Sequence, residues 1–299
     1  MSTPPLPPSG PPTDAPPVCP RHPDRVSYVR CQRCGRPACP ECQRPAAVGV
    51  QCVDCVAEAQ RNTRSVRTVF GGTARGGRPV VTLTIIGLCA VSWILQLTTQ
   101  QLDPSWTQRW AFSPAIGQAE PWRFLTAAFL HSTTPLHILF NMYALWLVGP
   151  FLEQAFGRGR FVALYVLAAV GGQVGVLLLA DPLQESWYVG VVGASGAVFG
   201  LFGAIIPVLR RLGRNAGQIV VLIAINMALP LFVPNIAWQA HIGGLVVGLV
   251  LGAGFALAPR ERQRLVGWAL PTAVGVVLVA AAVWKYSTVP TAAGLLGLF

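Results

Sequence analysis

Seven apolar stretches follow residue 78 and constrain the fold of this chain more than any other feature. They lie at 79–98, 136–156, 161–180, 194–212, 218–234, 237–258 and 266–286. A helix that spans a bilayer needs about 20 apolar residues, and each stretch reaches or approaches that length. Only 11% of the 299 residues are charged, whereas soluble proteins carry about 25%. The sequence therefore predicts an all-α polytopic membrane protein.

Basic residues mark one side of the predicted spans. All but one of the 22 basic residues are arginines, and Arg109 and Arg123 are the only arginines in the predicted outer connections. Clusters precede the first span or follow the second, fourth and sixth spans: Arg61, Arg64, Arg67, Arg75, Arg78, Arg158, Arg160, Arg210, Arg211, Arg214, Arg260, Arg262 and Arg264. Cytoplasmic loops of membrane proteins carry such an excess. We therefore expect a multi-pass protein of the plasma (inner) membrane with a cytoplasmic N-terminus. This placement accounts for the net charge of +11 without a nucleic-acid partner.

The connection 99–135 lies on the outer side in this topology and is rich in aromatic residues. Trp106, Trp110, Phe112, Trp122 and Phe124 fall within it. Aromatic side chains of this kind favour the interface between membrane and water. We expect a partly helical segment lying in the outer leaflet, with a solvated loop as the alternative.

Two polar residues near the outer ends of different spans carry the strongest chemical signal. Ser195 lies in Gly193-Ala-Ser-Gly196, and His241 lies near the start of the sixth span. Both fall roughly 6–8 Å below the outer ends of their helices. A serine that can pass its proton to an imidazole is an activated nucleophile. A serine in a helix can also simply bond back to a carbonyl of the preceding turn.

His137 and Asn141 start the second span and lie on one helical face, four residues apart. Together with the backbone N–H of Ser195, they could stabilise an oxyanion. They could equally bond across helices and serve packing alone. The spacing Gly244-x-x-x-Gly248 after His241 predicts a close contact that brings the sixth helix against the fourth.

Taken jointly, these residues resemble the rhomboid intramembrane serine proteases over about 79–258. The elements of the resemblance are Glu120-Pro-Trp122-Arg123, His137-Ile-Leu-Phe-Asn141, Gly193-Ala-Ser195-Gly196 and Ala240-His241-Ile-Gly-Gly244-x-x-x-Gly248. The resemblance implies a six-helix core at 79–258, to which this chain adds a seventh transmembrane helix at 266–286.

The resemblance also implies a function. Ser195 would be the nucleophile and His241 the general base, without an acidic third member, and no cofactor would take part in catalysis. His137, Asn141 and the Ser195 amide would bind the oxyanion, and Trp122-Arg123 would hold the first loop. The substrates would be transmembrane proteins cut near the outer face of the bilayer. The alternatives are a catalytically silent relative that binds membrane clients and, with least support, a transporter.

The chain departs from the family pattern at two positions. Phe199 stands one turn after the serine, where many relatives carry a tyrosine. A phenylalanine can stack on the imidazole but cannot donate a hydrogen bond. The spacing from His131 to His137 is one residue longer than in bacterial relatives, so no catalytic role is assigned to His131.

Seven of the eight cysteines lie between positions 19 and 55 in closely spaced pairs. With one histidine they make four pairs: Cys19 and His22, Cys31 and Cys34, Cys39 and Cys42, and Cys52 and Cys55. Eight soft ligands suit two tetrahedral zinc ions. Disulfides are the competing interpretation, but they are rare in the cytoplasm, where the topology places this segment.

The pattern resembles B-box-type double-zinc modules. We expect a cross-braced arrangement, in which the first and third pairs bind one ion and the second and fourth the other, with sequential pairing as the alternative. Both Zn²⁺ ions would be structural, and the module could dock a cytoplasmic partner. The predicted division of the chain is a disordered tail at 1–17, the zinc module at 18–59, a basic linker at 60–78, the core, the seventh helix and a C-terminal tail at 287–299.

Overall fold

The computed structural model describes residues 15–62, 67–72, 78–233 and 236–289. The chain divides into two compact units, residues 1–64 and 65–299. Most of the two predicted tails lies outside the described residues, as do Arg64, Arg75 and Pro234.

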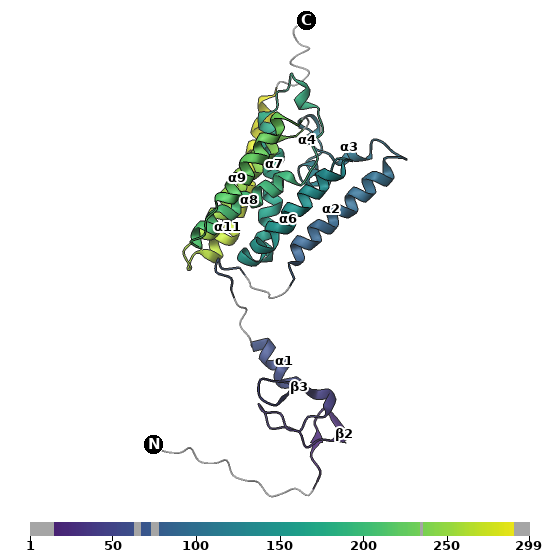
Figure 1. The fold of residues 1–299 in the computed structure, drawn as a ribbon, viewed down its shortest axis with the longest axis vertical. Helices are drawn as coiled ribbons and strands as arrows, with labels where there is room; N and C mark the ends of the chain where they lie inside the picture. The colour runs from purple at the N-terminus through teal and green to yellow at the C-terminus, as the bar shows by residue number, and fades with distance from the viewer. Residues whose placement is uncertain (1–14, 63–66, 73–77, 234–235, 290–299) are drawn as a thin grey trace. The chain divides into compact units, whose positions relative to one another are not determined.

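The first unit has two small antiparallel sheets and one helix. Strand β1 (Val18–Cys19) pairs with β2 (His22–Val26), and β3 (Gln43–Pro45) pairs with β4 (Val50–Cys52). A 3₁₀ turn, η1 (Pro40–Cys42), precedes β3, and helix α1 (Val53–Asn62) follows β4 (Figure 1). Its buried cluster consists of six cysteines and Ala38. So few apolar groups cannot stabilise a fold of this size, and a bound metal would supply the missing free energy.

The second unit contains a helix at each predicted span. They are α2 (Val80–Thr99), α6 (Pro135–Phe156), α7 (Arg158–Leu179), α8 (Ser195–Arg211), α9 (Gly217–Ala228), α10 (Trp238–Leu257) and α11 (Gln263–Thr288). Among the described residues, five of these are long and apolar enough to cross a membrane, while α8 and α9 have 17 and 12 residues. The prediction of an all-α polytopic fold with a seventh helix is confirmed.

Two helix boundaries differ from the sequence prediction. Helix α9 ends at Ala228, before the 3₁₀ turn η4 (Leu229–Leu231), because Pro230 cannot continue the α-helical hydrogen bonds. Helix α11 begins at Gln263, before the apolar stretch, so the arginine at 264 lies in its first turn.

The long connection between α2 and α6 is partly helical, as predicted. It contains α3 (Trp106–Trp110), α4 (Pro114–Gly117), α5 (Arg123–Thr126) and the 3₁₀ turn η2 (Ala127–Phe129). The connection between α7 and α8 contains η3 (Glu185–Trp187). The two connections meet at a bridge between Phe112 and Val191.

Helix α10 packs against α8 through backbone contacts at successive glycines. A Cβ atom built on Gly244 would lie 1.9 Å from the carbonyl oxygen of Gly196. One on Gly248 would lie 1.9 Å from the carbonyl oxygen of Gly200. Only glycine allows two helices to approach this closely. The predicted contact between the fourth and sixth helices is therefore confirmed.

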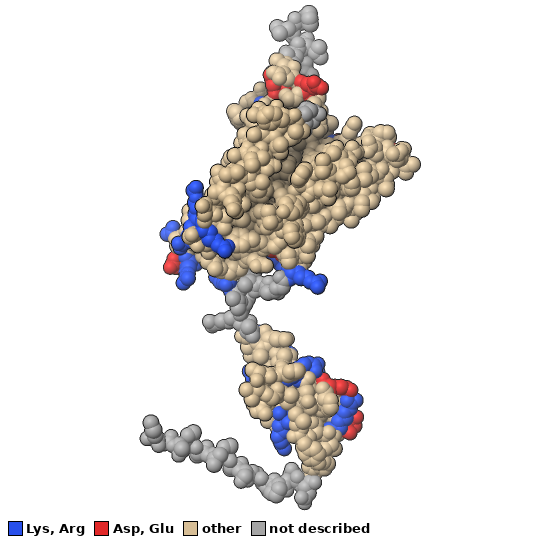
Figure 2. Space-filling model, in the orientation of Figure 1, with Lys and Arg blue, Asp and Glu red and all other residues tan. Residues whose placement is uncertain are grey.

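Most arginines of the second unit gather at one end of the helix bundle, where Figure 2 shows blue atoms, whereas Arg109 and Arg123 lie in the connection between α2 and α6. Buried Glu153 of α6 accepts hydrogen bonds there from the N–H groups of Val81 and Thr82, 3.1 and 2.9 Å long. This carboxylate satisfies first-turn amides of α2 that have no partner within the helix. At the same end Arg160 donates to the carbonyl of Phe70, whose buried ring packs on Phe156. The linker residues 67–72 are thereby fixed to the bundle.

The seventh helix joins the opposite end of the bundle through its last turns. Lys285 Nζ donates to the carbonyls of Leu178 and Ala180 at the end of α7, over 3.2 and 3.0 Å. Tyr286 donates its hydroxyl proton to the carbonyl of Pro114, 3.0 Å away in the long connection. Helix α11 therefore supports the connection 99–135 as well as α7.

Candidate active site and metal clusters

The predicted polar residues come together at the end of the bundle opposite the cluster of arginines that contains Arg160 and Arg210. Ser195 is the first residue of α8, directly after its N-cap, Ala194. His241 is in the first turn of α10, and His137 is in the first turn of α6. The helix N-termini leave backbone N–H groups without intrahelical partners. The site therefore gathers a hydroxyl, two imidazoles and the unpaired amides of a helix start.

The space at Gly193 lies between the serine and one imidazole. A Cβ atom built on Gly193 would lie 2.9 Å from Nε2 of His137 and 3.6 Å from Oγ of Ser195. The φ angle of Gly193 is +135°, a conformation that other residues rarely adopt. Because residue 193 has no side chain, an oxygen atom of a substrate could occupy this position. A reacting carbonyl needs such a position, close to both nucleophile and hydrogen-bond donors.

A backbone contact fixes which nitrogen of His137 carries the proton. The N–H group of Ser132 lies 3.1 Å from Nδ1 of His137 and donates to it. The Ser132 hydroxyl lies 3.1 Å from the same atom. A neutral imidazole that accepts at one nitrogen is protonated at the other. His137 therefore presents Nε2–H as a donor toward the space at Gly193.

Asn141 lies one turn after His137 and is buried. Its Nδ2 donates to the His137 carbonyl over 2.9 Å. An amide NH₂ group has two N–H bonds, so a second donor stays available. The structure thus places Asn141 beside His137 on one face of α6.

The ring of His241 stacks on the ring of Phe199. Their centroids are 4.1 Å apart and the ring planes differ by 7°. His241 is buried, and its Nδ1 atom has no hydrogen-bond partner among the described residues. The ring is therefore held by stacking rather than by a carboxylate. This is the contact expected of a phenylalanine at position 199.

Ser195 and His241 lie on neighbouring helix starts. A Cβ atom on Gly196, the residue after the serine, would lie 3.3 Å from the carbonyl oxygen of Ala240, the residue before the histidine. Phe199, one turn after Ser195, carries the stacked His241 ring. Within the described part of the chain no hydrogen bond joins Ser195 Oγ to the imidazole. Such bonds are often long in substrate-free active sites and shorten when substrate binds.

Arg123 positions the segment that leads into Ser195. Its buried guanidinium pairs with Glu120 at 2.7 Å and donates to the carbonyl of Ala111 at 2.8 Å. The next residue, Phe112, exchanges two backbone hydrogen bonds with Val191. Two residues later, the Gly193 amide donates to the Ala127 carbonyl at 2.9 Å. Arg123 therefore holds the loop that shapes the site, as the resemblance implied, whereas the Trp122 side chain is half exposed.

Sequence reasoning missed two residues that orient this site. Ser132 sets the tautomer of His137, and Gln96 of α2 holds the backbone of His131. Gln96 accepts from the His131 N–H at 3.0 Å and donates to its carbonyl at 2.9 Å. The His131 ring is buried, and neither ring nitrogen has a partner among the described residues. Its centroid lies 5.3 Å from that of His137, so its contact with the site is through packing. Gln96 could have been found from the sequence as a polar residue within an apolar span.

Comparisons with known proteins identify the family of this chain. The Rhomboid domain model matches residues 118–258. The putative rhomboid protease YdcA of Bacillus subtilis is 32% identical over 192 residues, which cover 62% of this chain and 92% of that protein. The chain belongs to the rhomboid family.

Two longer relatives match about half of this chain. Rhomboid protease GluP of Bacillus subtilis is 37% identical over 150 residues, which are 48% of this chain but 27% of that protein. RHOMBOID-like protein 1 of Arabidopsis thaliana is 34% identical over 174 residues, covering 54% of this chain and 42% of the relative. This rhomboid thus spans about a quarter to a half of the length of these two relatives.

The N-terminal unit of this rhomboid brings its eight predicted ligands into two groups. One contains Cys19, His22, Cys39 and Cys42, and the other contains Cys31, Cys34, Cys52 and Cys55. Within each group the ligand atoms lie within 4.8 Å of one another. The grouping is the cross-braced one, because the first ligand pair joins the third and the second joins the fourth. All eight cysteines of the chain are free thiols rather than disulfides.

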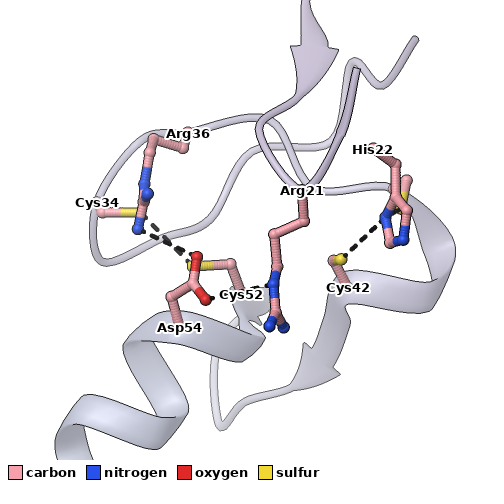
Figure 3. Close-up of polar contacts among 8 residues, drawn as sticks. Arg21, His22, Cys34, Arg36, Cys42, Cys52 and Asp54 are labelled. Carbon is pink, nitrogen blue, oxygen red and sulfur yellow. Dashed lines mark hydrogen bonds and ion pairs between the residues drawn. The ribbon is translucent and has the colours of Figure 1, made fainter. Parts of the chain in front are cut away.

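The separations within each group fit a tetrahedral ion. Sγ atoms of Cys34 and Cys52 are 3.7 Å apart, and Nδ1 of His22 lies 3.3 and 3.4 Å from the sulfurs of Cys39 and Cys42 (Figure 3). Zn–S and Zn–N bonds of about 2.3 and 2.0 Å imply separations of roughly 3.8 Å between two sulfurs and about 3.5 Å between sulfur and nitrogen. The residues present therefore fit two zinc ions.

Charged groups surround the two clusters. Nε2 of His22 faces Glu41 at 3.8 Å, the kind of carboxylate contact that orients a ligating histidine. The guanidinium of Arg36 donates to Cys34 Sγ over 3.4 Å and lowers the pKa of that thiol, which favours the thiolate. Asp54 pairs with Arg21 at 3.7 Å and with Arg36 at 3.5 Å (Figure 3). These ion pairs connect the loops of both clusters to the first turn of α1.

Proposed function

We propose that this chain is an intramembrane serine endopeptidase that cleaves transmembrane proteins near the outer face of the membrane. Ser195 is the nucleophile and His241 is the general base. The observation that supports this most directly is the space at Gly193, which has Nε2 of His137 on one side and Oγ of Ser195 on the other. Membership of a family that includes named rhomboid proteases supports the same reaction class.

The first half of the reaction uses both helix starts. Ser195 Oγ attacks the carbonyl carbon of the scissile bond while its proton passes to His241. The negative charge that develops on the carbonyl oxygen is stabilised by the Nε2–H of His137, the free N–H of Asn141 and the backbone N–H of Ser195. When the C–N bond breaks, His241 returns the proton to the leaving amine. An acyl group then remains on Ser195.

The second half hydrolyses this acyl-enzyme. A water molecule gives a proton to His241 and attacks the ester carbon, and the same donors stabilise the second oxyanion. The bond to Ser195 Oγ breaks, and His241 reprotonates the serine. No cofactor takes part. A transmembrane substrate must unwind locally, since a helix hides its carbonyl groups in its own hydrogen bonds.

The N-terminal unit is proposed to hold two structural zinc ions, which crosslink its loops and stabilise them. The eight ligands are those of the two groups described above. They leave no open coordination position, so the ions take no part in peptide hydrolysis. We place this unit in the cytoplasm and the chain in the plasma (inner) membrane, because the arginines gather at the end of the bundle where the linker is attached.

The test is labelling of the detergent-solubilised protein with a fluorophosphonate, followed by a cleavage assay on a transmembrane substrate. Wild type should be labelled, and Ser195→Ala and His241→Ala should not. Cleavage by Ser195→Ala should fall to background, a loss of at least about 10⁴-fold. Residual cleavage by folded Ser195→Ala would refute the assignment of Ser195 as the nucleophile. Absence of labelling in folded wild type would instead favour a client-binding protein without activity.

A further inference from the structure

We propose that this rhomboid binds one anionic phospholipid in a groove between α10 and α11, at the arginine-bearing end of the bundle. The acyl chains lie in the groove, and the phosphate is bound by the turn that joins the two helices. This site is distinct from the serine and histidine, which lie at the opposite end, and it does not depend on the proposed protease activity.

The groove has the chemistry of a hydrocarbon site. Its volume is about 550 Å³, in the range of small-molecule sites. All eight lining residues are apolar, and small ones, Ala253, Gly254, Ala258 and Ala269, make it concave. Leu270 packs directly over Gly254: a Cβ on that glycine would lie 2.1 Å from Leu270 Cδ2. Val266 Cγ1 would lie 3.8 Å from the same Cβ, so two side chains of α11 pack against α10 beside the groove.

The turn beside the groove carries a local excess of positive charge. Arg260, Arg262 and Arg264 are exposed, and Glu261 is the single acidic residue among them. Within the described residues, none of the three guanidinium groups forms an ion pair. Figure 2 shows that this end of the bundle is strongly basic. Guanidinium groups bind phosphate through paired N–H donors.

The groove and the turn together specify one class of ligand. An apolar surface facing the membrane accepts acyl chains, and the adjoining arginines require a negative headgroup. Trp268, 62% exposed on α11, lies about one and a half turns after Gln263, at the level where aromatic side chains meet the headgroup region. Basic pockets between transmembrane helices bind anionic headgroups in this way. An anionic phospholipid satisfies both halves of the site.

The test is native mass spectrometry of the full-length protein, delipidated in detergent and titrated with phosphatidylglycerol or phosphatidylcholine of matched acyl chains. Wild type should bind one phosphatidylglycerol at least about tenfold more tightly than phosphatidylcholine. The triple variant Arg260→Gln, Arg262→Gln, Arg264→Gln should lose this preference. The triple variant Arg210→Gln, Arg211→Gln, Arg214→Gln, in the turn between α8 and α9, should retain it.

A second pair of variants tests the groove itself. Ala269→Phe fills it and should reduce the binding of both lipids, whereas Ala273→Phe, on an exposed position of the same helix, should not. Thermal unfolding of each variant in detergent checks that it is folded. Equal affinity for the two lipids in wild type, or equal losses in both arginine triples, would overturn the proposal, because general surface charge would then account for binding.

Discussion

At the scale of single residues, Gly193 shapes the candidate site although it carries no functional group. Its φ of +135° turns the chain into α8, and the missing Cβ leaves a space beside both His137 and Ser195. A side chain at this position would be strained, at a cost of order 1–3 kcal/mol. It would also occupy the place proposed for the carbonyl oxygen. The two effects are separable because strain lowers stability while obstruction lowers the rate.

Gly193→Ala should therefore reduce kcat by at least about 10²-fold, since loss of oxyanion stabilisation has an effect of this size. The strain should also lower the melting temperature in detergent, so kcat is compared at a temperature at which the variant is still folded. Gly190→Ala is the matched control: it lies in the same loop, and its Cβ would lie 3.6 Å from the Ala111 side chain, an ordinary contact. Measurement of kcat and KM for both variants tests whether the substrate carbonyl oxygen occupies the space at residue 193. Full activity in Gly193→Ala would contradict the proposed oxyanion position.

The sequence identified the residues whose types are unusual in apolar segments, and it could not identify those that act through the backbone. Ser195, His241, His137 and Asn141 are polar groups within spans, which made them visible. Ser132 orients His137 chiefly through its N–H group, which every residue except proline possesses. No pattern of side chains encodes such a contact, so only the fold reveals it.

At the scale of elements, the contact between α8 and α10 sets the distance between Ser195 and His241. The glycines at 244 and 248 approach the carbonyls of Gly196 and Gly200 with no side chain between them. The other face of α10 packs on α7 in the same way, since a Cβ on Gly243 would lie 2.2 Å from the Gly171 carbonyl oxygen. Helix α10 is thus held between two neighbours by backbone contacts.

Gly248→Ala should force α8 and α10 apart, because the new methyl group would lie 1.9 Å from the Gly200 oxygen. Overpacking of this kind costs about 1–3 kcal/mol. We expect a lower melting temperature and a fall in kcat. Gly87→Ala, in α2, is the control, because a Cβ there would contact nothing within 4 Å. Unchanged stability and activity in Gly248→Ala would show that the helices are spaced by other contacts.

The existence of the helices was predictable, and their ends were less so. Long apolar stretches can cross a bilayer only as helices, because the backbone must satisfy its own hydrogen bonds there. The polar first turn of α11 and the early end of α9 depend on local hydrogen bonding and on Pro230. The carboxylate of Glu153 caps α2 although it lies 72 positions after Val81 and 71 positions after Thr82. A pattern along one segment cannot reveal such a contact.

At the scale of the whole molecule, a metal-dependent unit and a bundle of apolar helices are stabilised by different forces. The first unit buries cysteines and little else, whereas the second buries a large apolar core. Binding of metal would supply most of the folding free energy of the first unit. Loss of metal should therefore unfold one unit and leave the other intact.

Chelation, or Cys31→Ser, should unfold the N-terminal unit while fluorophosphonate labelling of Ser195 is retained. Mass measurement of the native protein should give two zinc ions before chelation and none after it. Cys89→Ser is the control, because Cys89 lies in α2, outside both ligand groups. A native protein without bound metal would refute the zinc proposal. Loss of labelling together with the metal would show that the two units are energetically coupled.

The backbone contact between α8 and α10 also bears on how this rhomboid would respond to its bilayer. A membrane whose thickness differs from the hydrophobic length of a protein makes helices tilt or shift. Because backbone atoms rather than side chains form the contact between α8 and α10, no change of side-chain rotamer can relax it. The two helices should therefore move as one body. Helix α9, in which no residue is buried, can adjust alone. Changes in lateral pressure would then alter access to Ser195 and His241 while the spacing of these two residues stays constant.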